Sequence, residues 1–322
     1  MKAVVFKKYG SPDVLQLQEV EKPVPKDGQV LVKIQAASVN ALDWHLLRAD
    51  PFPVRLAFGL LKPKNNILGA DIAGRVEAVG KNAGQFQPGD EVFGDIFPSG
   101  LGGFAEYACA AGETLVKKPA AISFEEAAAL PVAGLTALQA LRDHGHIQPG
   151  QKVLVNGAAG GVGTFAVQIA KSFGAEVTGV CGRGNLEMVR SIGADHVIDY
   201  TLEDFTQKGQ VYDLILAANG YHPIWDYKRA LRPKGIYVMS GGSGAQMFQA
   251  MIFGPWISMI GTRKMGNMMA KSNQKDLSVL KELVENGKIK PVIDRRYPLS
   301  EVAQAIRYLE EGHARGKVII TV

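Results

Sequence analysis

The sequence predicts an α/β protein in which a doubly wound parallel sheet follows an all-β unit. Short β-rich runs alternate with Gly and Pro over residues 1 to about 120, whereas β and α patterns alternate after residue 150. A Gly-rich turn joins the first strand of that second part to a helix. Strands separated by helix-length segments are typical of a parallel sheet covered by helices.

The first part of the chain is expected to form a β barrel. Strands are predicted at 3–6, 29–36, 72–79, 90–93 and 103–110, and runs of this length and spacing are typical of barrels. Helical structure is predicted to begin at Ser123, which precedes Phe124-Glu125-Glu126 in the manner of an N-cap. The Ala-rich segment that follows, through Pro131 to Leu141, is predicted to form two helical pieces.

Six strands with helices between them are expected after Gly150. They are predicted at 152–155, 176–180, 196–198, 212–217, 235–239 and 257–262, an order that describes a doubly wound sheet. A helix at 272–286, an extended segment at 291–297, a helix at 300–311 and a last strand at 317–322 complete the chain. We expect this tail to return to the first domain, so that residues 1–120 and 289–322 form one domain and residues 121–288 the other.

Composition and charge indicate a globular protein and do not indicate nucleic-acid binding or a membrane span. The chain has 322 residues, 47% apolar and 21% charged, and its net charge of +5 is spread without a basic run. Cys109 and Cys181 are its two cysteines, so no disulfide framework is indicated and a reducing, cytoplasmic location is expected. The apolar run 247–260 contains Gly254-Pro255 and is too short to span a bilayer.

The turn at 156–163, Asn-Gly-Ala-Ala-Gly-Gly-Val-Gly, has the sequence of a dinucleotide-binding turn. It follows the apolar run 152–155 and opens a helical pattern, and a second strand follows at the spacing at which such folds bind the adenosine ribose. Gly160 is expected to let the backbone approach the pyrophosphate, and Gly163 to let helix and strand pack closely. The other cofactor-binding residues expected in this turn are Ala159, Gly161 and Val162.

The end of the second strand favours NADPH over NADH. NAD sites usually place an acid there, whereas residues 181–185 read Cys-Gly-Arg-Gly-Asn, so that Gly182 and Arg183 are expected at the 2'-phosphate. Arg183 could instead be an ordinary solvated residue. Tyr200, at the end of the next strand, could cover the adenine or simply pack.

Four segments resemble the medium-chain dehydrogenase/reductase superfamily, in its zinc-free quinone oxidoreductase (zeta-crystallin-like) branch. They are Tyr-Gly-Ser-Pro-Asp-Val-Leu at 9–15, Ala-Ser-Val-Asn-Ala-Leu-Asp at 37–43, Gly-Asp-Glu-Val-Phe-Gly at 89–94 and Ala-Ala-Gly-Gly-Val-Gly at 158–163. The segment 180–194 also looks like plant envelope quinone oxidoreductase homologues and alkenal reductases. The resemblance implies a GroES-like β-barrel domain, a Rossmann domain with an active-site cleft between them, NADPH as hydride donor, and a homodimer.

Zinc chemistry is not expected. Metal-dependent members of this superfamily hold catalytic zinc with a Cys where this chain has Asn40 and with a His where it has Ala70, and two cysteines cannot build their four-Cys lobe. His45 and Asp71 are close to these positions in the sequence, so a metal site remains an alternative.

The expected activity is NADPH-dependent reduction of quinones or α,β-unsaturated carbonyls. Without a Lewis acid, an isolated carbonyl has little to stabilise a developing alkoxide, whereas a conjugated acceptor spreads the charge onto an oxygen that hydrogen-bond donors can hold. The alternatives are a zinc-free alcohol or aldehyde oxidoreductase and a non-catalytic NADPH-binding protein.

The remaining site residues are expected on both domains. Asn40 could donate to the acceptor oxygen, orient the nicotinamide or cap local backbone; Asp43 could fix its loop or move a proton; and Trp44 could wall the pocket or lie in the core. On the cofactor side the expected residues are Thr136, Ser240, Gly241, Arg315 and Lys317. Packing, turn geometry or solvation could explain each of these equally simply. The Met and aromatic cluster in 247–259 is expected in the core, at a dimer edge or in an adaptable pocket wall.

Overall fold

The chain divides into two units, and the computed structural model describes residues 1–207, 209 and 211–322. Unit 1 comprises Met1–Ala133, Ser272–Asn286 and Pro291–Val322, and unit 2 comprises Gly134–Lys271 and Gly287–Lys290. The units differ from the expected domain limits at 121–133 and 272–286, which lie in unit 1, and at 289–290, which lie in unit 2. The physical reason is packing, because the helix after Ser123 covers strands of unit 1 and the helix after Asn273 packs on β7 (Leu115–Lys117) of the same unit.

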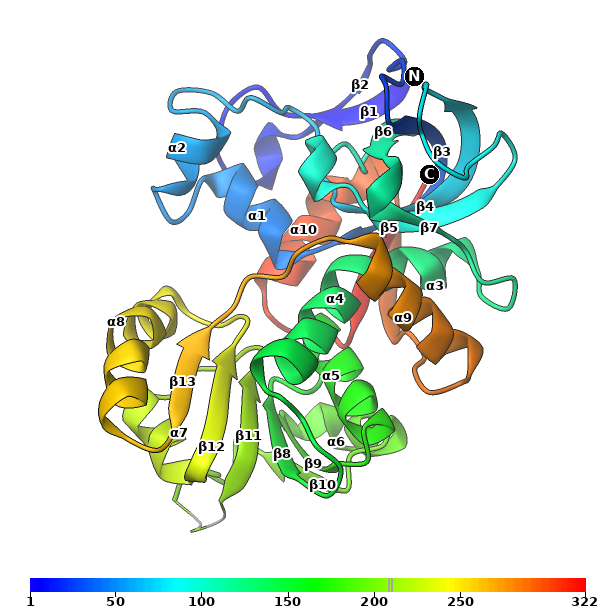
Figure 1. The fold of residues 1–322 in the computed structure, drawn as a ribbon. Helices are drawn as coiled ribbons and strands as arrows, with labels where there is room; N and C mark the ends of the chain where they lie inside the picture. The colour runs from blue at the N-terminus through cyan, green and yellow to red at the C-terminus, as the bar shows by residue number, and fades with distance from the viewer. Residues whose placement is uncertain (208, 210) are drawn as a thin grey trace. The chain divides into compact units, whose positions relative to one another are not determined.

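Unit 1 is built on a seven-stranded sheet and a two-stranded sheet (Figure 1). The order of the larger sheet is β14-β15-β3-β4-β5-β7, with β6 also paired to β3, and β1 pairs with β2. The strands not yet given are β1 (Lys2–Val5), β2 (Gln16–Glu19), β3 (Gln29–Val39), β4 (Asp71–Val79), β5 (Glu91–Asp95), β6 (Tyr107–Ala111), β14 (Ile293–Pro298) and β15 (Lys317–Thr321). Strand β15 pairs antiparallel with β3, so the last strand of the chain lies in unit 1.

Unit 1 also contains α-helices. They are α1 (Ala41–Arg48), α2 (Val54–Phe58), α3 (Phe124–Ala129), α9 (Gln274–Glu285) and α10 (Val302–Glu310). Of these, α3, α9 and α10 pack on strands of its larger sheet. The predicted N-cap is confirmed, because the Ser123 hydroxyl accepts from Glu126 N–H at 3.1 Å while the Glu126 carboxylate accepts from Ser123 N–H at 2.9 Å. Helix α10 buries Val302, Ala305 and Ile306, the spacing of one helical face.

Unit 2 contains a six-stranded, all-parallel sheet in the order β10-β9-β8-β11-β12-β13 (Figure 1). The strands are β8 (Lys152–Asn156), β9 (Glu176–Cys181), β10 (His196–Asp199), β11 (Tyr212–Ala217), β12 (Leu231–Met239) and β13 (Lys264–Asn267). Its helices are α5 (Gly161–Ser172), α6 (Leu186–Ser191), α7 (Ile224–Ala230) and α8 (Gly244–Ile260), preceded by α4 (Pro131–Gln139), which begins in unit 1, and by a π-helical turn at Ala140–His144. The chain order reverses between β8 and β11, so ligands are expected at the carboxyl ends of these strands.

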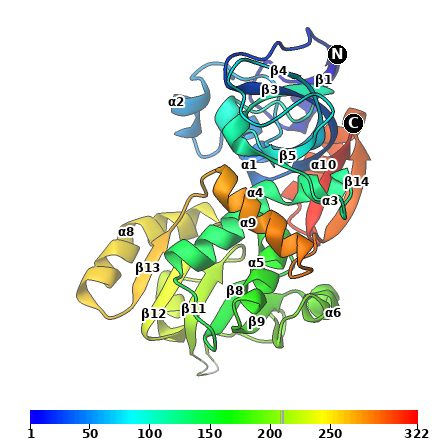
Figure 2. The same cartoon turned by 45° about the vertical axis from the view of Figure 1, so that its right-hand side comes forward.

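The strand predicted at 257–262 is wrong. Residues up to Ile260 belong to α8, which continues through Gly254-Pro255, and the sixth strand is the shorter β13. Helix α8 lies along β13 (Figure 2) and buries Gln246, Ala250, Gly254 and Ile257. Three of these four residues are small or polar. The sequence therefore lacks the large apolar residues at helical spacing that would have predicted a helix.

No helix in the described part of the chain is both long and apolar enough to cross a bilayer.

Candidate active and cofactor site

The turn between β8 and α5 has the geometry of a phosphate-binding turn. A Cβ placed on Gly163 would lie 2.0 Å from Gly157 O, a distance that side-chain atoms do not reach, so Gly163 is required for the close approach of helix and strand. At Gly160 the nearest atom to such a Cβ is 3.6 Å away, and its φ of −81° and ψ of 177° are ordinary. Close packing within the protein therefore explains why residue 163 is glycine, but it does not explain why residue 160 is glycine.

Free backbone donors lie at the start of α5. Gly160 has no side chain that could cap the helix, and Thr164 is the first residue of the helix whose N–H bonds back, to Gly160 O at 2.9 Å. The N–H groups of Gly161, Val162 and Gly163 have no partner among the described residues. Such groups, with the helix dipole behind them, favour an anion.

Arg183 and Tyr200 lie at the ends of the neighbouring strands β9 and β10. Arg183 starts a 3-10 turn after Gly182 and is exposed, and no hydrogen bond or ion pair of the described residues involves its guanidinium. Tyr200 is 62% exposed, and a Cβ on Gly182 would lie 3.3 Å from its hydroxyl. The structure thus brings Gly182 and Tyr200 together, and Arg183 follows Gly182 in the chain with its guanidinium exposed.

Ser240 carries a buried hydroxyl oxygen with no hydrogen-bond partner among the described residues. It follows β12, and its N–H donates to Ala217 O at 3.0 Å, which fixes it at the carboxyl end of the sheet. A buried hydroxyl is normally hydrogen-bonded, so this one fits a ligand that reaches it. Gly241 has a different explanation, because a Cβ there would lie 2.4 Å from Ala218 O.

The positions of two other predicted cofactor residues, Thr136 and Arg315, say less about a ligand. Thr136 is buried on α4 with 8% of its surface exposed. Arg315 is exposed on the loop before β15, where its backbone N–H donates to the Asp294 carboxylate at 2.9 Å. Neither position by itself indicates a ligand.

Asn40 and Lys317 meet in a buried polar cluster of unit 1. The Lys317 ammonium donates to Asn40 Oδ1 at 2.6 Å and to Asp71 Oδ2 at 3.1 Å. Asn40 Nδ2 donates to the same Asp71 oxygen at 2.9 Å, as does the Ser38 hydroxyl at 2.6 Å. Lys317, predicted at the cofactor, therefore lies beside the residue predicted at the acceptor.

Asp43 is held by backbone groups. Its two carboxylate oxygens accept from Asn40 N–H at 2.8 Å and from Gly69 N–H at 2.9 Å, so it ties the start of α1 to the loop before β4. Burial raises the pKa of Asp43 to about 7, against the lowering effect of these two hydrogen bonds. Its contacts are those of a residue that orders the loop.

Trp44 is half-buried on α1, and its ring stacks on His45 with centroids 3.6 Å apart. Its side chain packs against the core of unit 1, which agrees with the alternative that it is a packing residue.

Ser38 and Asp95 are members of this polar region that were not predicted as site residues, and Asp71 was considered only for an alternative metal site. Asp71 is fully buried and also accepts from Val132 N–H at 2.8 Å. Asp95 is buried and bonded to the Ser272 hydroxyl; burial, followed by repulsion from Asp71, raises its pKa to about 6. The missing signal was strand register, since β3 lies between β4 and β15 and places Ser38 opposite Asp71.

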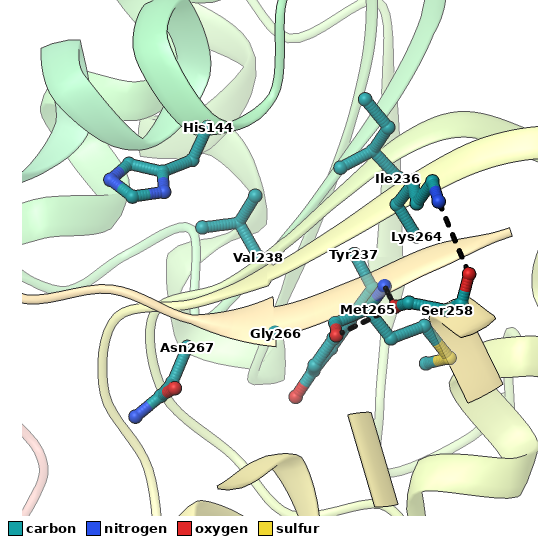
Figure 3. Close-up of a pocket in the computed structure, with 9 residues that line it drawn as sticks. All are labelled: His144, Ile236, Tyr237, Val238, Ser258, Lys264, Met265, Gly266 and Asn267. Carbon is teal, nitrogen blue, oxygen red and sulfur yellow. Dashed lines mark hydrogen bonds between the residues drawn. The ribbon is translucent and has the colours of Figure 1, made fainter. Parts of the chain in front are cut away.

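A hollow of about 200 Å³ lies elsewhere in unit 2 (Figure 3). It is lined by His144, Ile236, Tyr237, Val238, Ser258, Lys264, Met265, Gly266 and Asn267, none of which is a predicted site residue. Ser258 fixes its wall, because its hydroxyl accepts from Met265 N–H at 2.9 Å and its carbonyl from Lys264 at 3.1 Å. Among the described residues, no group of three or more His, Cys, Asp or Glu side chains could hold a metal ion.

Two family models match the chain. The alcohol dehydrogenase GroES-like domain matches residues 26–120, and the zinc-binding dehydrogenase model matches residues 192–320.

Curated relatives and solved structures match the chain over nearly its whole length. It is 34% identical to chloroplastic quinone-oxidoreductase QR1 of Triphysaria versicolor, covering 99% of this chain and 98% of the relative. It is also 34% identical to the chloroplastic NADPH-dependent alkenal/one oxidoreductase of Arabidopsis thaliana, over 99% of this chain and 79% of that one. The structure of the quinone oxidoreductase from Coxiella burnetii superposes with a TM-score of 0.88 at 33% identity, over 100% of this chain and 99% of the other.

Proposed function

Because the chain belongs to the medium-chain dehydrogenase/reductase superfamily, in its zinc-free quinone oxidoreductase branch, we propose that it reduces quinones or α,β-unsaturated carbonyls with NADPH. The observation that carries the proposal is the β8–α5 turn, where Gly160 has no close steric neighbour and three N–H groups have no partner among the described residues. NADPH, when bound, supplies the hydride. The printed names of the relatives support the two acceptor classes.

The residues of unit 2 would bind and orient the dinucleotide. The N–H groups at the start of α5 would hold the pyrophosphate, and the exposed guanidinium of Arg183 would pair with the 2'-phosphate. Tyr200 would lie against the adenine side, and the unpaired Ser240 hydroxyl would bond to the nicotinamide half. The preference for NADPH over NADH depends on Arg183, since no carboxylate stands at the end of β9.

We propose that the reaction proceeds without zinc. The positions that hold zinc in metal-dependent relatives carry an amide and a methyl group here, and the Asn40 amide is bonded to Lys317 and Asp71. A neutral amide and a methyl group are poor ligands for zinc, which takes thiolate, imidazole or carboxylate. This donor set favours acceptors whose developing charge is delocalised onto an oxygen.

The partner we propose is a second copy of the chain. Strand β13 ends the parallel sheet and pairs only with β12 among the described strands, and α8 lies beside it. Helix α8 has no charged residue, and eight of its apolar side chains are exposed: Met247, Phe248, Met251, Ile252, Phe253, Trp256, Met259 and Ile260. A contiguous apolar face next to a free strand edge suits an isologous interface better than it suits water.

An NADPH oxidation screen with product identification tests the proposed activity. Purified protein is incubated with NADPH and a panel of quinones, enones, simple alcohols and aldehydes, and the products are identified by mass spectrometry. We expect turnover of at least one quinone or enone, unaffected by a chelator. Oxidation of simple alcohols with NADP⁺ would support the alcohol oxidoreductase instead, and saturable NADPH binding without any turnover would support a non-catalytic protein.

A further inference from the structure

Strand register places Lys317 beside Asn40, which stands where metal-dependent relatives have a zinc-binding Cys. Strands β15 and β3 are antiparallel with Val318 opposite Val39, so Lys317 comes next to Asn40 at the ends of the two strands. On the other side of β3, Asp71 lies opposite Ser38. Three separate segments of unit 1 therefore meet at one ammonium group.

The Asn40 amide has no hydrogen left for an acceptor. An amide nitrogen carries two N–H groups; one donates to Asp71 at 2.9 Å and the other is directed to Ser38 O at 3.5 Å. Its oxygen is occupied by Lys317 at 2.6 Å. Asn40 could donate to a substrate only by giving up its bond to a buried carboxylate, which is unfavourable.

Lys317 does have a hydrogen left. An ammonium carries three N–H groups, and Asn40 and Asp71 take two of them. The third has no acceptor among the described residues, although only 3% of the residue is exposed. A buried ammonium normally saturates its donors, so the unused N–H suits an oxygen supplied from outside the chain.

Carboxylates surround the Lys317 ammonium group. Asp71 forms the ion pair, and Asp43 and Asp95 also interact electrostatically with the ammonium. Ser38 Oγ–H and Val132 N–H hold the Asp71 carboxylate in place at 2.6 Å and 2.8 Å. The ammonium group is therefore fixed in position by Asn40 and Asp71.

We propose that Lys317 is a catalytic residue, whose free N–H donates to the acceptor oxygen and stabilises the negative charge that hydride transfer places there. The inference rests on the proposed function. In the reaction the C4–H bond of NADPH would break and a C–H bond would form at the acceptor carbon with the same electron pair, oxidising the cofactor to NADP⁺, while the displaced π pair would move onto the oxygen facing Lys317. Water supplies the proton that completes the product. Asp71 and Asn40 act as positioning residues, and the ammonium replaces the Lewis acid of the metal-dependent relatives.

Replacement of Lys317 by Gln is the first test, with Lys33→Met on the exposed face of β3 as the control. A single donor of this kind contributes on the order of 10²–10³ in kcat. We expect Lys317→Gln to lower kcat by about that factor while the Kd for NADPH changes by less than about 3-fold, and Lys33→Met to leave both unchanged. Wild-type kcat in folded Lys317→Gln would overturn the inference and leave the proposed function intact.

A phenol titration tests the same group without turnover and without relying on the fold of a variant. 4-Nitrophenol carries the oxygen of a reduced quinone, and its ionised form absorbs visible light. With wild-type protein saturated with NADP⁺, we expect the pKa of bound 4-nitrophenol to fall by about one unit or more, as a neighbouring cation requires. An unchanged pKa in the bound phenol would overturn the inference. Wild-type protein that reduces no quinone or enone would instead overturn the proposed function, and the catalytic role of Lys317 with it.

Discussion

Alanine at Gly160 and alanine at Gly163 should have opposite effects, although the two residues lie in the same turn. At Gly163 the new methyl group would lie 2.0 Å from Gly157 O and 2.8 Å from the Ala158 backbone. Overpacking costs about 1–3 kcal/mol, and a contact this short with backbone belongs at the upper end. Alanine regains about 1 kcal/mol inside a helix, so the expected net loss is about 2 kcal/mol.

At Gly160 the same methyl group meets nothing closer than 3.6 Å, and the backbone angles there are allowed for alanine. Such a substitution stabilises a protein by about 0.4–1 kcal/mol through the unfolded chain. The methyl group would, however, occupy the space through which the pyrophosphate reaches the N–H groups of α5. We expect NADPH affinity to fall by about 10- to 100-fold, or about 1.4–2.8 kcal/mol.

Calorimetry measures both effects in the two variants. Gly163→Ala should melt about 4–8 °C below wild type in the transition that reports unit 2, whereas Gly160→Ala should melt at or above the wild-type temperature. Titration should give weak NADPH binding to Gly160→Ala. If Gly160→Ala binds NADPH as wild type does, the pyrophosphate does not lie on this turn and the cofactor site has been misplaced. A Gly163→Ala protein as stable as wild type would refute the packing argument.

Three further predictions concern other parts of the molecule. Arg183→Ala should weaken NADPH binding by about 10- to 100-fold and NADH binding by less than about 3-fold, as measured by titration; equal losses would contradict a contact with the 2'-phosphate. Burial raises the pKa of Asp43 to about 7, so the folded state binds a proton at this carboxyl more tightly than the unfolded state does. The resulting contribution to the free energy of unfolding is present below about pH 4 and is lost as the pH rises through 7. Urea unfolding should therefore show wild type losing on the order of 3 kcal/mol more than Asp43→Asn between pH 4 and pH 8, and parallel pH profiles would refute this. Trp256→Glu combined with Met259→Glu should halve the mass measured by light scattering, whereas a monomeric wild type would rule out the proposed dimer.

The turn between β8 and α5 was predictable because its signals are local. Alternating strand and helix patterns surround it, and the glycine spacing of 156–163 follows directly from the needs of a tight turn. The N-cap at Ser123 is local in the same sense, since the capping partners are three residues apart. Arg183 and Tyr200 could be placed together because parallel strands end at the same edge of a sheet.

Helix α8 was not predictable, because the apolar residues of its sequence show no clear helical period. The face it buries contains Gln246, Ala250 and Gly254 besides Ile257, whereas eight of its large apolar residues are exposed. A continuous apolar run of that kind does not distinguish a strand from a buried helix.

The hydrogen-bond partners of Lys317 could not be predicted, for a different reason. The contact with Asp71 joins residues 246 positions apart and depends on the registers of β15 and β4 against β3. Sequence reasoning could place Lys317 just before the last strand, but no local signal gives the register between such distant strands.

Transfer of an isotope from the cofactor to the product tests the central claim most directly. The protein is incubated with NADPH carrying deuterium at nicotinamide C4 and with an enone, and the product is examined by NMR. Direct hydride transfer to a conjugated acceptor predicts one deuterium on the carbon β to the carbonyl, with the proton on the α carbon coming from water. Deuterium on the carbinol carbon, or a product with no deuterium from either face of the ring, would contradict it.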